Sequence, residues 1–126
     1  MRPLRYFKTW WALGAVYFVF IVCASLINLP PELALPSDKL LHFVAYLVLS
    51  AWFGAVYQKS RHIGVLMASV LTGITLEVLQ LLTGHRSLEV LDMLANTLGA
   101  TAGITLARTR LGESLVHLEQ QLFAAA

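Results

Sequence analysis

The chain has 126 residues, of which 58% are hydrophobic and only 13% are charged. Soluble domains carry about 25% charged residues, so this chain has too few charges to cover a surface that faces water. The composition therefore excludes an ordinary soluble domain and a disordered chain, and it indicates one membrane-embedded domain over residues 1–126. The net charge of +2 is too small to indicate nucleic-acid binding. The single cysteine cannot form an internal disulfide or a cysteine-rich zinc site.

Four apolar stretches are long enough to cross a membrane, which takes about 20 residues of helix. They cover residues 10–29, 40–57, 63–82 and 90–107. We therefore predict an all-α fold, a polytopic bundle of four transmembrane helices. An alternative, in which the first stretch is a cleaved signal peptide, is disfavoured because about 20 apolar residues exceed a usual signal-peptide core.

The tail over residues 108–126 predicts one more, shorter helix. Apolar residues recur there every three or four positions, the spacing of one face of an amphipathic helix, at Leu111, Leu115, Leu118 and Leu122. We expect this helix to lie on the inner membrane surface or against the bundle, where a structural end-cap is the favoured role.

The basic residues predict the orientation of the bundle. With four spans, both termini lie on the same side of the membrane. Seven basic residues fall on that side: Arg2, Arg5, Lys8, Lys59, Arg61, Arg108 and Arg110. Only Lys39 and Arg86 fall on the other side. Because cytoplasmic loops carry the excess of Lys and Arg, we expect both termini in the cytoplasm.

Several polar side chains interrupt the last three spans, all in the half predicted to be external. Pairs three or four residues apart share a helix face, and such pairs are Asp38 with His42, Glu77 with Gln80, and Asp92 with Asn96. Polar groups in membrane helices usually face the bundle interior and often mark function. We therefore expect one buried cluster in which Lys39 and Arg86 balance the three carboxylates. A stripe of small residues at Ala95, Gly99 and Gly103 would allow close helix packing there.

These residues resemble the VanZ-like family, named for the teicoplanin-resistance protein VanZ. The matching pattern runs Asp38-Lys39-x-x-His42-Phe43-x-x-Tyr46, Glu77-x-x-Gln80, Arg86 and Asp92-x-x-x-Asn96-x-x-Gly99. The resemblance covers most of the chain, from about residue 38 to residue 103. It implies a small multi-pass protein of the bacterial cytoplasmic membrane with a role in the cell envelope. For the founding member it also implies lowered susceptibility to teicoplanin. It does not imply a particular reaction.

Two functional interpretations stay open. In the favoured one the protein is not an enzyme, and the cluster binds a lipid-linked envelope precursor or another anionic amphiphile. Its binding residues are then Asp38, Lys39, His42, Glu77, Gln80, Arg86, Asp92 and Asn96. In the alternative it is an acid–base active site on a lipid or wall-precursor headgroup, with His42, Glu77 and Asp92 as catalytic candidates.

We expect membrane lipids or a lipid-linked precursor as partners, and no nucleic acid. We expect no cofactor. Although histidine and carboxylates are ligand types, no metal site is predicted, because the two-histidine helical spacing of known metal motifs is absent from the sequence. A homo-oligomer stays open, because a proton-coupled carrier, a third alternative, would need more than four spans for alternating access.

Overall fold

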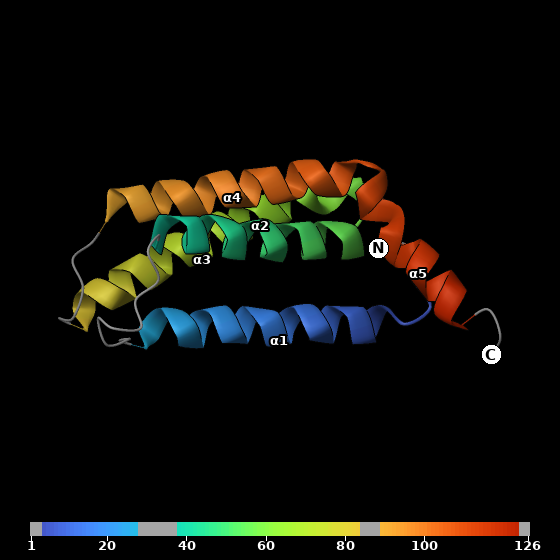
Figure 1. The fold of residues 1–126 in the computed structure, drawn as a ribbon, viewed down its shortest axis with the longest axis horizontal. Coiled ribbons are helices and arrows are strands. Elements are labelled where there is room, and N and C mark those ends of the chain that lie inside the picture. Colours follow the sequence, from blue (N-terminus) through green and yellow to red (C-terminus); the bar gives the residue numbers. More distant parts are fainter. Residues whose placement is uncertain (1–3, 28–37, 84–88, 124–126) are drawn as a thin grey trace.

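The computed structural model describes residues 4–27, 38–83 and 89–123, and these residues form a helical bundle (Figure 1). The long helices are α1 (Phe7–Leu26), α2 (Asp38–Val56), α3 (His62–Leu82) and α4 (Val90–Arg108). A shorter helix, α5 (Ser114–Phe123), follows α4. Single 3₁₀ turns at Lys59–Arg61 and Arg110–Glu113 precede α3 and α5. The prediction of an all-α bundle with four long apolar helices and a short last helix is confirmed.

Helices α1 to α4 are each long and apolar enough to cross a membrane. Their outer faces carry large apolar side chains with most of their surface uncovered, such as Val16 at 68% and Phe20 at 65%. An exposed apolar surface of this extent would drive a soluble protein to aggregate, whereas lipid covers it at no cost. Helix α1 begins three residues earlier than the predicted span, and the predicted end of that span at residue 29 lies outside the described residues.

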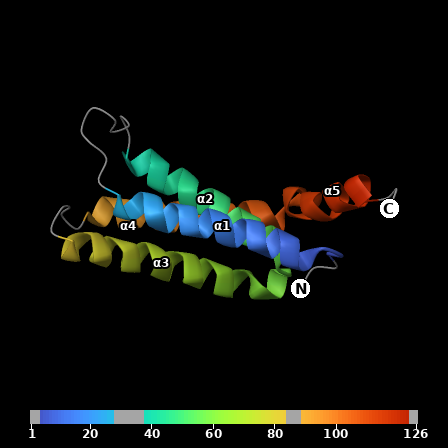
Figure 2. The same ribbon diagram turned by 90° about the horizontal axis from the view of Figure 1, so that it is seen from below.

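The bundle has two distinct ends. At the tail end, α1 begins, α2 is joined to α3, and α5 follows α4, so both termini lie there (Figures 1 and 2). At the opposite end, which we call the polar end, α2 and α4 begin and α3 finishes. An even number of spans puts both termini at the same end of the bundle, as found here. The side of the membrane that each end faces stays a prediction.

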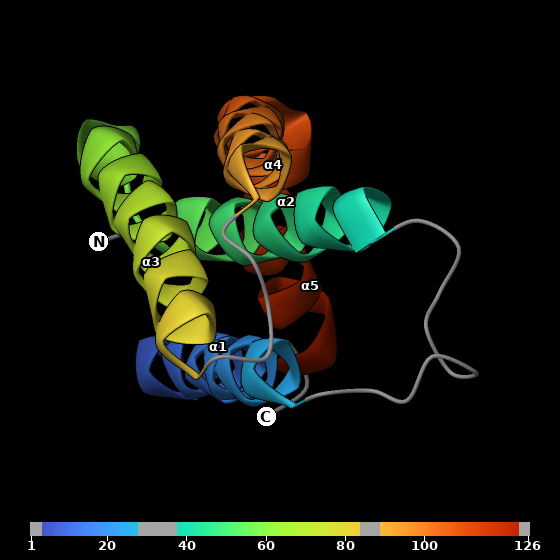
Figure 3. The ribbon, with the colours of Figure 1, turned by 90° about the vertical axis from the view of Figure 1, so that its left-hand side faces the viewer.

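Helix α2 is the centre of the bundle, with α1, α3 and α4 around it in the end-on view of Figure 3. Its closest partner is α4, which runs in the same general direction and crosses α2 at an angle (Figure 3). A Cβ added at Gly99 would collide with the Phe43 carbonyl oxygen, and one at Gly103 would lie 2.8 Å from the Ala51 amide nitrogen. The two backbones therefore touch, which confirms the close helix packing expected from the small-residue stripe.

Helix α5 attaches the end of the chain to the beginning of α1. The Glu119 carboxylate accepts hydrogen bonds from the backbone N–H groups of Arg5 at 2.7 Å and Tyr6 at 2.8 Å, and from the Trp10 indole at 3.0 Å. Burial would raise the pKa of this carboxyl, but the three hydrogen bonds outweigh burial and hold the pKa below its ordinary value. Glu119 thus satisfies two backbone amide groups just before the first turn of α1.

Fewer leucines of α5 pack against the bundle than the leucine pattern predicts. Leu115 is buried beside Trp10 and Val56, whereas Leu118 and Leu122 stay exposed. The side chain of Leu111 is not among those that the structure describes. The end-cap role favoured for this helix agrees with the contacts, and it is achieved mainly through Glu119, a residue to which the pattern gave no structural role.

His62 is the first residue of α3 and is fully buried. It lies just outside the predicted spans 40–57 and 63–82, so the sequence pattern gave it no role. Its Nε2 lies 2.9 Å from the Gly54 carbonyl oxygen of α2. The imidazole therefore links the ends of two helices near the tail end.

Candidate functional site

The polar end is built by the first turns of α2 and α4. Because these helices run in the same general direction and touch at Gly99, their opening turns lie side by side. Asp38, Lys39 and His42 on α2 therefore meet Asp92 and Asn96 on α4. Five of the eight predicted binding residues lie together in this cluster, which we call the polar-end cluster.

Lys39 forms the ion pairs of the cluster. Its Nζ lies 2.7 Å from Glu89 Oε2 and 3.2 Å from Asp92 Oδ1. Asp92 is almost completely buried, with 3% of its side chain exposed, whereas Lys39 and Glu89 are about half exposed. A buried carboxylate needs such a partner, because removing an ion from water costs several kcal/mol. The expected pairing of Lys39 with a carboxylate is present, and it extends to Glu89.

Glu89 is the residue of this cluster that sequence reasoning missed. The signal that could have found it is its position three residues before Asp92, which puts both carboxylates on one helix face.

His42 joins the two helices through both ring nitrogens. Its Nδ1 lies 3.0 Å from Asn96 Oδ1, a hydrogen-bonding distance. Its Nε2 lies 3.8 Å from Asp38 Oδ1 and 3.8 Å from Asp92 Oδ2. These longer separations exceed a direct hydrogen bond. The imidazole is thus fixed on one side by an amide and faces two carboxylates on the other.

The α3 residues lie beside this cluster in different environments. Glu77 and Gln80 are both buried. The Gln80 side-chain amide donates a 2.6 Å hydrogen bond to the Ser25 carbonyl of α1, so it joins α3 to α1 and not to the cluster. Glu77 interacts electrostatically with the buried Tyr46 phenol of α2. It lies one turn from Gly73, which packs against Asn96. Arg86, the eighth predicted residue, lies outside the described residues.

The donor atoms in the cluster are of the kinds that bind metal ions. One oxygen each from Asp38 and Asp92 and one nitrogen from His42 lie within 4.8 Å of one another. Two of these residues come from α2 and one from α4, so the arrangement depends on the packing of the two helices.

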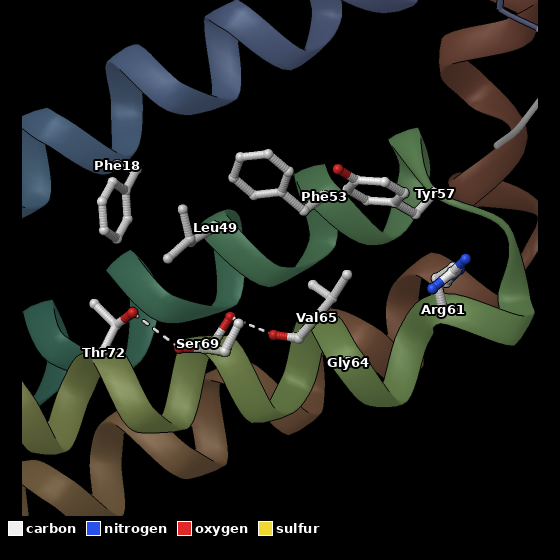
Figure 4. A pocket seen from close by; sticks show the side chains of 10 residues that line it. Phe18, Leu49, Phe53, Tyr57, Arg61, Gly64, Val65, Ser69 and Thr72 are labelled. Carbon is white, nitrogen blue, oxygen red and sulfur yellow. Dashed lines mark hydrogen bonds between the residues drawn. The ribbon is translucent and has the colours of Figure 1, made fainter.

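A separate groove lies nearer the tail end, between α1, α2 and α3 (Figure 4). Its volume is about 550 Å³, and its walls are mostly apolar, with Phe18 and Phe53 opposite the α3 backbone. Tyr57 and Arg61 lie at the end of the groove toward the α2–α3 connection. None of the predicted site residues lines this groove, so the cavity and the polar-end cluster are different features.

Comparison with known proteins adds the family. The family model for VanZ/LLP1 matches residues 2–112, almost the whole chain. A curated relative, the uncharacterized protein C11E3.10 of Schizosaccharomyces pombe, is 27% identical over 97 residues. The match covers 73% of this chain and 60% of that protein. The chain thus spans about three fifths of the length of this relative. No solved structure matches the chain.

Proposed function

The chain belongs to the VanZ/LLP1 family, and on this basis we propose that it is a multi-pass membrane protein that binds an anionic amphiphile at its polar end. The ligand class is a membrane lipid or a lipid-linked precursor of the cell envelope. We place the protein in the bacterial cytoplasmic membrane with both termini in the cytoplasm, so that the polar end faces outward. A link to teicoplanin susceptibility is part of the same proposal.

The observation that carries the proposal is the position of Lys39. The ammonium group has three N–H donors, and its two carboxylate partners in the described residues leave one for a ligand. Lys39 is in the first turn of α2 with 46% of its side chain exposed, and the proposal puts this end of the helix at the membrane surface. A phosphate or carboxylate headgroup is the chemistry that such a cation attracts.

The apolar surface next to Lys39 supports an amphiphilic ligand. Leu40 is 58% exposed, and Val90 and Leu91 at the start of α4 are 61% and 60% exposed. A molecule whose headgroup contacts Lys39 would lay its hydrocarbon chain over these side chains. The ligand would thus be held by one charge contact and by apolar packing below it.

A lipid-binding measurement tests the proposal. Purified protein is mixed with a membrane lipid extract, and retained molecules are identified by native mass spectrometry. We expect an anionic amphiphile to be retained by the wild type and by Lys39→Arg, and to be lost from Lys39→Gln. The matched control is Lys59→Gln, which removes an exposed lysine at the other end of the bundle.

Equal retention by Lys39→Gln and the wild type would refute the proposal. A thermal unfolding curve for each variant shows whether it still folds. Because Lys39→Gln leaves the buried Asp92 carboxylate unpaired, a destabilised fold is a foreseeable result. In that event the Lys39→Arg variant decides the test. It preserves the positive charge, so it must still retain the ligand if the charge is what binds it, and loss of the ligand from a folded Lys39→Arg variant would refute the proposal.

A second candidate, catalysis on a headgroup, is favoured by the geometry of His42. Its ring is held by Asn96, and its other nitrogen lies near two carboxylates, so three groups of the kinds that act as general acids and bases are close together. The replacement His42→Gln keeps hydrogen bonding but removes titration. If the protein is an enzyme, this variant inserts and folds but no longer converts the retained lipid. If it only binds, the lipid is retained unchanged by both proteins.

A further inference from the structure

We propose that Asp38, His42 and Asp92 form a binding site for a divalent cation that accepts both nitrogen and oxygen ligands, such as Mn²⁺ or Zn²⁺. The inference goes beyond the proposed function, because it requires no amphiphile. It rests on the tautomer of one histidine, on an under-satisfied buried carboxylate, on the spacing of three donor atoms and on the local charge.

The hydrogen bond to Asn96 fixes which nitrogen of His42 is available. An amide oxygen can only accept, so Asn96 Oδ1 receives the Nδ1–H of the imidazole at 3.0 Å. In that tautomer Nε2 carries a lone pair. It faces Asp38 Oδ1 and Asp92 Oδ2, each 3.8 Å away. Three electron-rich atoms thus face one another, an arrangement that a cation between them stabilises.

Asp92 supplies a second, independent observation. Its side chain is 97% covered, and its Oδ1 receives no hydrogen bond of good geometry from the described residues, although Lys39 Nζ lies 3.2 Å away. Buried polar atoms in folded proteins almost always have partners. The carboxylate is thus only partly satisfied by its pairing with Lys39, and its other oxygen, Oδ2, is the one that faces the histidine lone pair.

The spacing of the donor atoms fits a cation without a large rearrangement. The three donors lie within 4.8 Å of one another, with the two histidine–aspartate separations at 3.8 Å. A point about 2.4 Å from all three then exists, which is within the range of Ca²⁺–oxygen distances. Inward shifts of about 0.2–0.4 Å give the shorter bonds of Zn²⁺. An imidazole among the ligands favours a transition metal over Ca²⁺.

The surrounding charges favour a divalent cation. Three carboxylates of the described polar end, those of Asp38, Glu89 and Asp92, lie around His42 and Lys39, and carboxylate oxygens are ligands that attract a divalent cation. Asn96 would act as the outer partner that orients a metal-binding histidine, a common feature of such sites. A bound cation would also add positive charge beside Lys39, in agreement with an anionic ligand.

Titration with Mn²⁺ tests the inference on the full chain in detergent, without added lipid. Free Mn²⁺ gives a six-line electron paramagnetic resonance signal that is lost on binding. We expect one saturable Mn²⁺ per chain in the wild type. Asp38→Asn, His42→Gln and Asp92→Asn should each weaken binding by at least about 10-fold, and Asn96→Ala by about 10- to 100-fold, as outer-partner losses do.

The matched control is Glu113→Gln, an exposed carboxylate at the tail end, which should bind Mn²⁺ as the wild type does. Asp38 decides the test if Asp92→Asn fails to fold, because 43% of the Asp38 side chain is exposed and its replacement leaves the core intact. The inference is overturned if the wild type binds no Mn²⁺ with saturation, or if Asp38→Asn binds it as tightly as the Glu113→Gln control.

Discussion

Replacing Gly99 with alanine should disrupt the contact between α2 and α4 that forms the polar end. The new Cβ would overlap the carbonyl oxygen of Phe43 and lie 3.0 Å from its carbonyl carbon. These neighbours are backbone atoms, so no change of side-chain rotamer relieves the overlap. The two helices must move apart, and the contacts that join them on either side are lengthened.

The destabilisation caused by this overlap can be separated from the gain in helix propensity that any glycine-to-alanine replacement brings. Alanine is better than glycine in a helix by about 0.5–1 kcal/mol, whereas inserting a methyl group into a packed contact costs about 1–3 kcal/mol. Gly64 of α3 provides the matched control, because a Cβ there meets nothing within 4 Å. Both replacements gain the propensity contribution. Gly99→Ala should therefore be about 1–3 kcal/mol less stable than Gly64→Ala, roughly 5- to 150-fold in the folding equilibrium.

Reversible unfolding in mixed detergent and SDS micelles measures this difference, with helix content followed by circular dichroism. We expect the Gly99→Ala midpoint to lie at a lower SDS fraction than that of the wild type, and the Gly64→Ala midpoint at an equal or higher one. If the two alanine variants are equally stable, then α2 and α4 are not in backbone contact. The placement of the polar-end cluster across these helices would then be refuted as well.

Two further predictions concern the rest of the bundle. Glu119→Gln should expose the backbone amides of Arg5 and Tyr6, which donate to Glu119 just before α1, to hydrogen exchange. Because the folded pKa of this carboxyl is lowered, its stabilisation is complete above the ordinary pKa of 4.5 and is lost as the pH falls through the lowered value. Relative to the intrinsic exchange rate at each pH, exchange of these amides should therefore rise at low pH in the wild type and in Glu113→Gln but vary less in Glu119→Gln, and a pH-independent protection factor in the wild type would contradict this. Ser50→Ala removes a buried 3.0 Å hydrogen bond to Ser69 and should cost about 0.6–1.5 kcal/mol in SDS unfolding, with the exposed Ser60→Ala unchanged. Equal stability of Ser50→Ala and Ser60→Ala would contradict it.

The sequence predicted the spans because hydropathy and length alone decide which helices can cross a membrane. It also predicted close packing of the last span from Gly99 and Gly103. It could not name the partner helix, because small residues on one helix show that a backbone can approach but not which backbone does. The contacts with Phe43 and Ala51 depend on the opposing helix, which carries no glycine at those positions.

The candidate site was predicted in part for a similar reason. Pairs on one helix face, such as Asp38 with His42, follow from helix geometry and are found together. Gln80 was assigned to the same cluster by depth alone, but its amide turns to the Ser25 carbonyl of α1. The position of a residue along its span predicts how deep in the membrane it lies. Which neighbouring helix it contacts depends on how its own helix is rotated about the helix axis.

The capping of α1 by Glu119 could not be predicted, because it joins residues more than a hundred positions apart. Sequence patterns report local periodicity, and the leucine spacing of the last helix gave Glu119 no structural role. The open amide groups at the start of α1 were a signal that an acceptor is needed. They did not identify the acceptor.

The attachment of α5 to α1 has a consequence for biogenesis. Of the four spans, α1 has the least covered surface, since only 17% of its apolar window is buried. Its start is fastened by Glu119, which is synthesised after all four spans. During synthesis, the α1 segment would therefore be inserted in the lipid but only loosely associated with the other helices. It would become attached when α5 is made and Glu119 binds the start of α1.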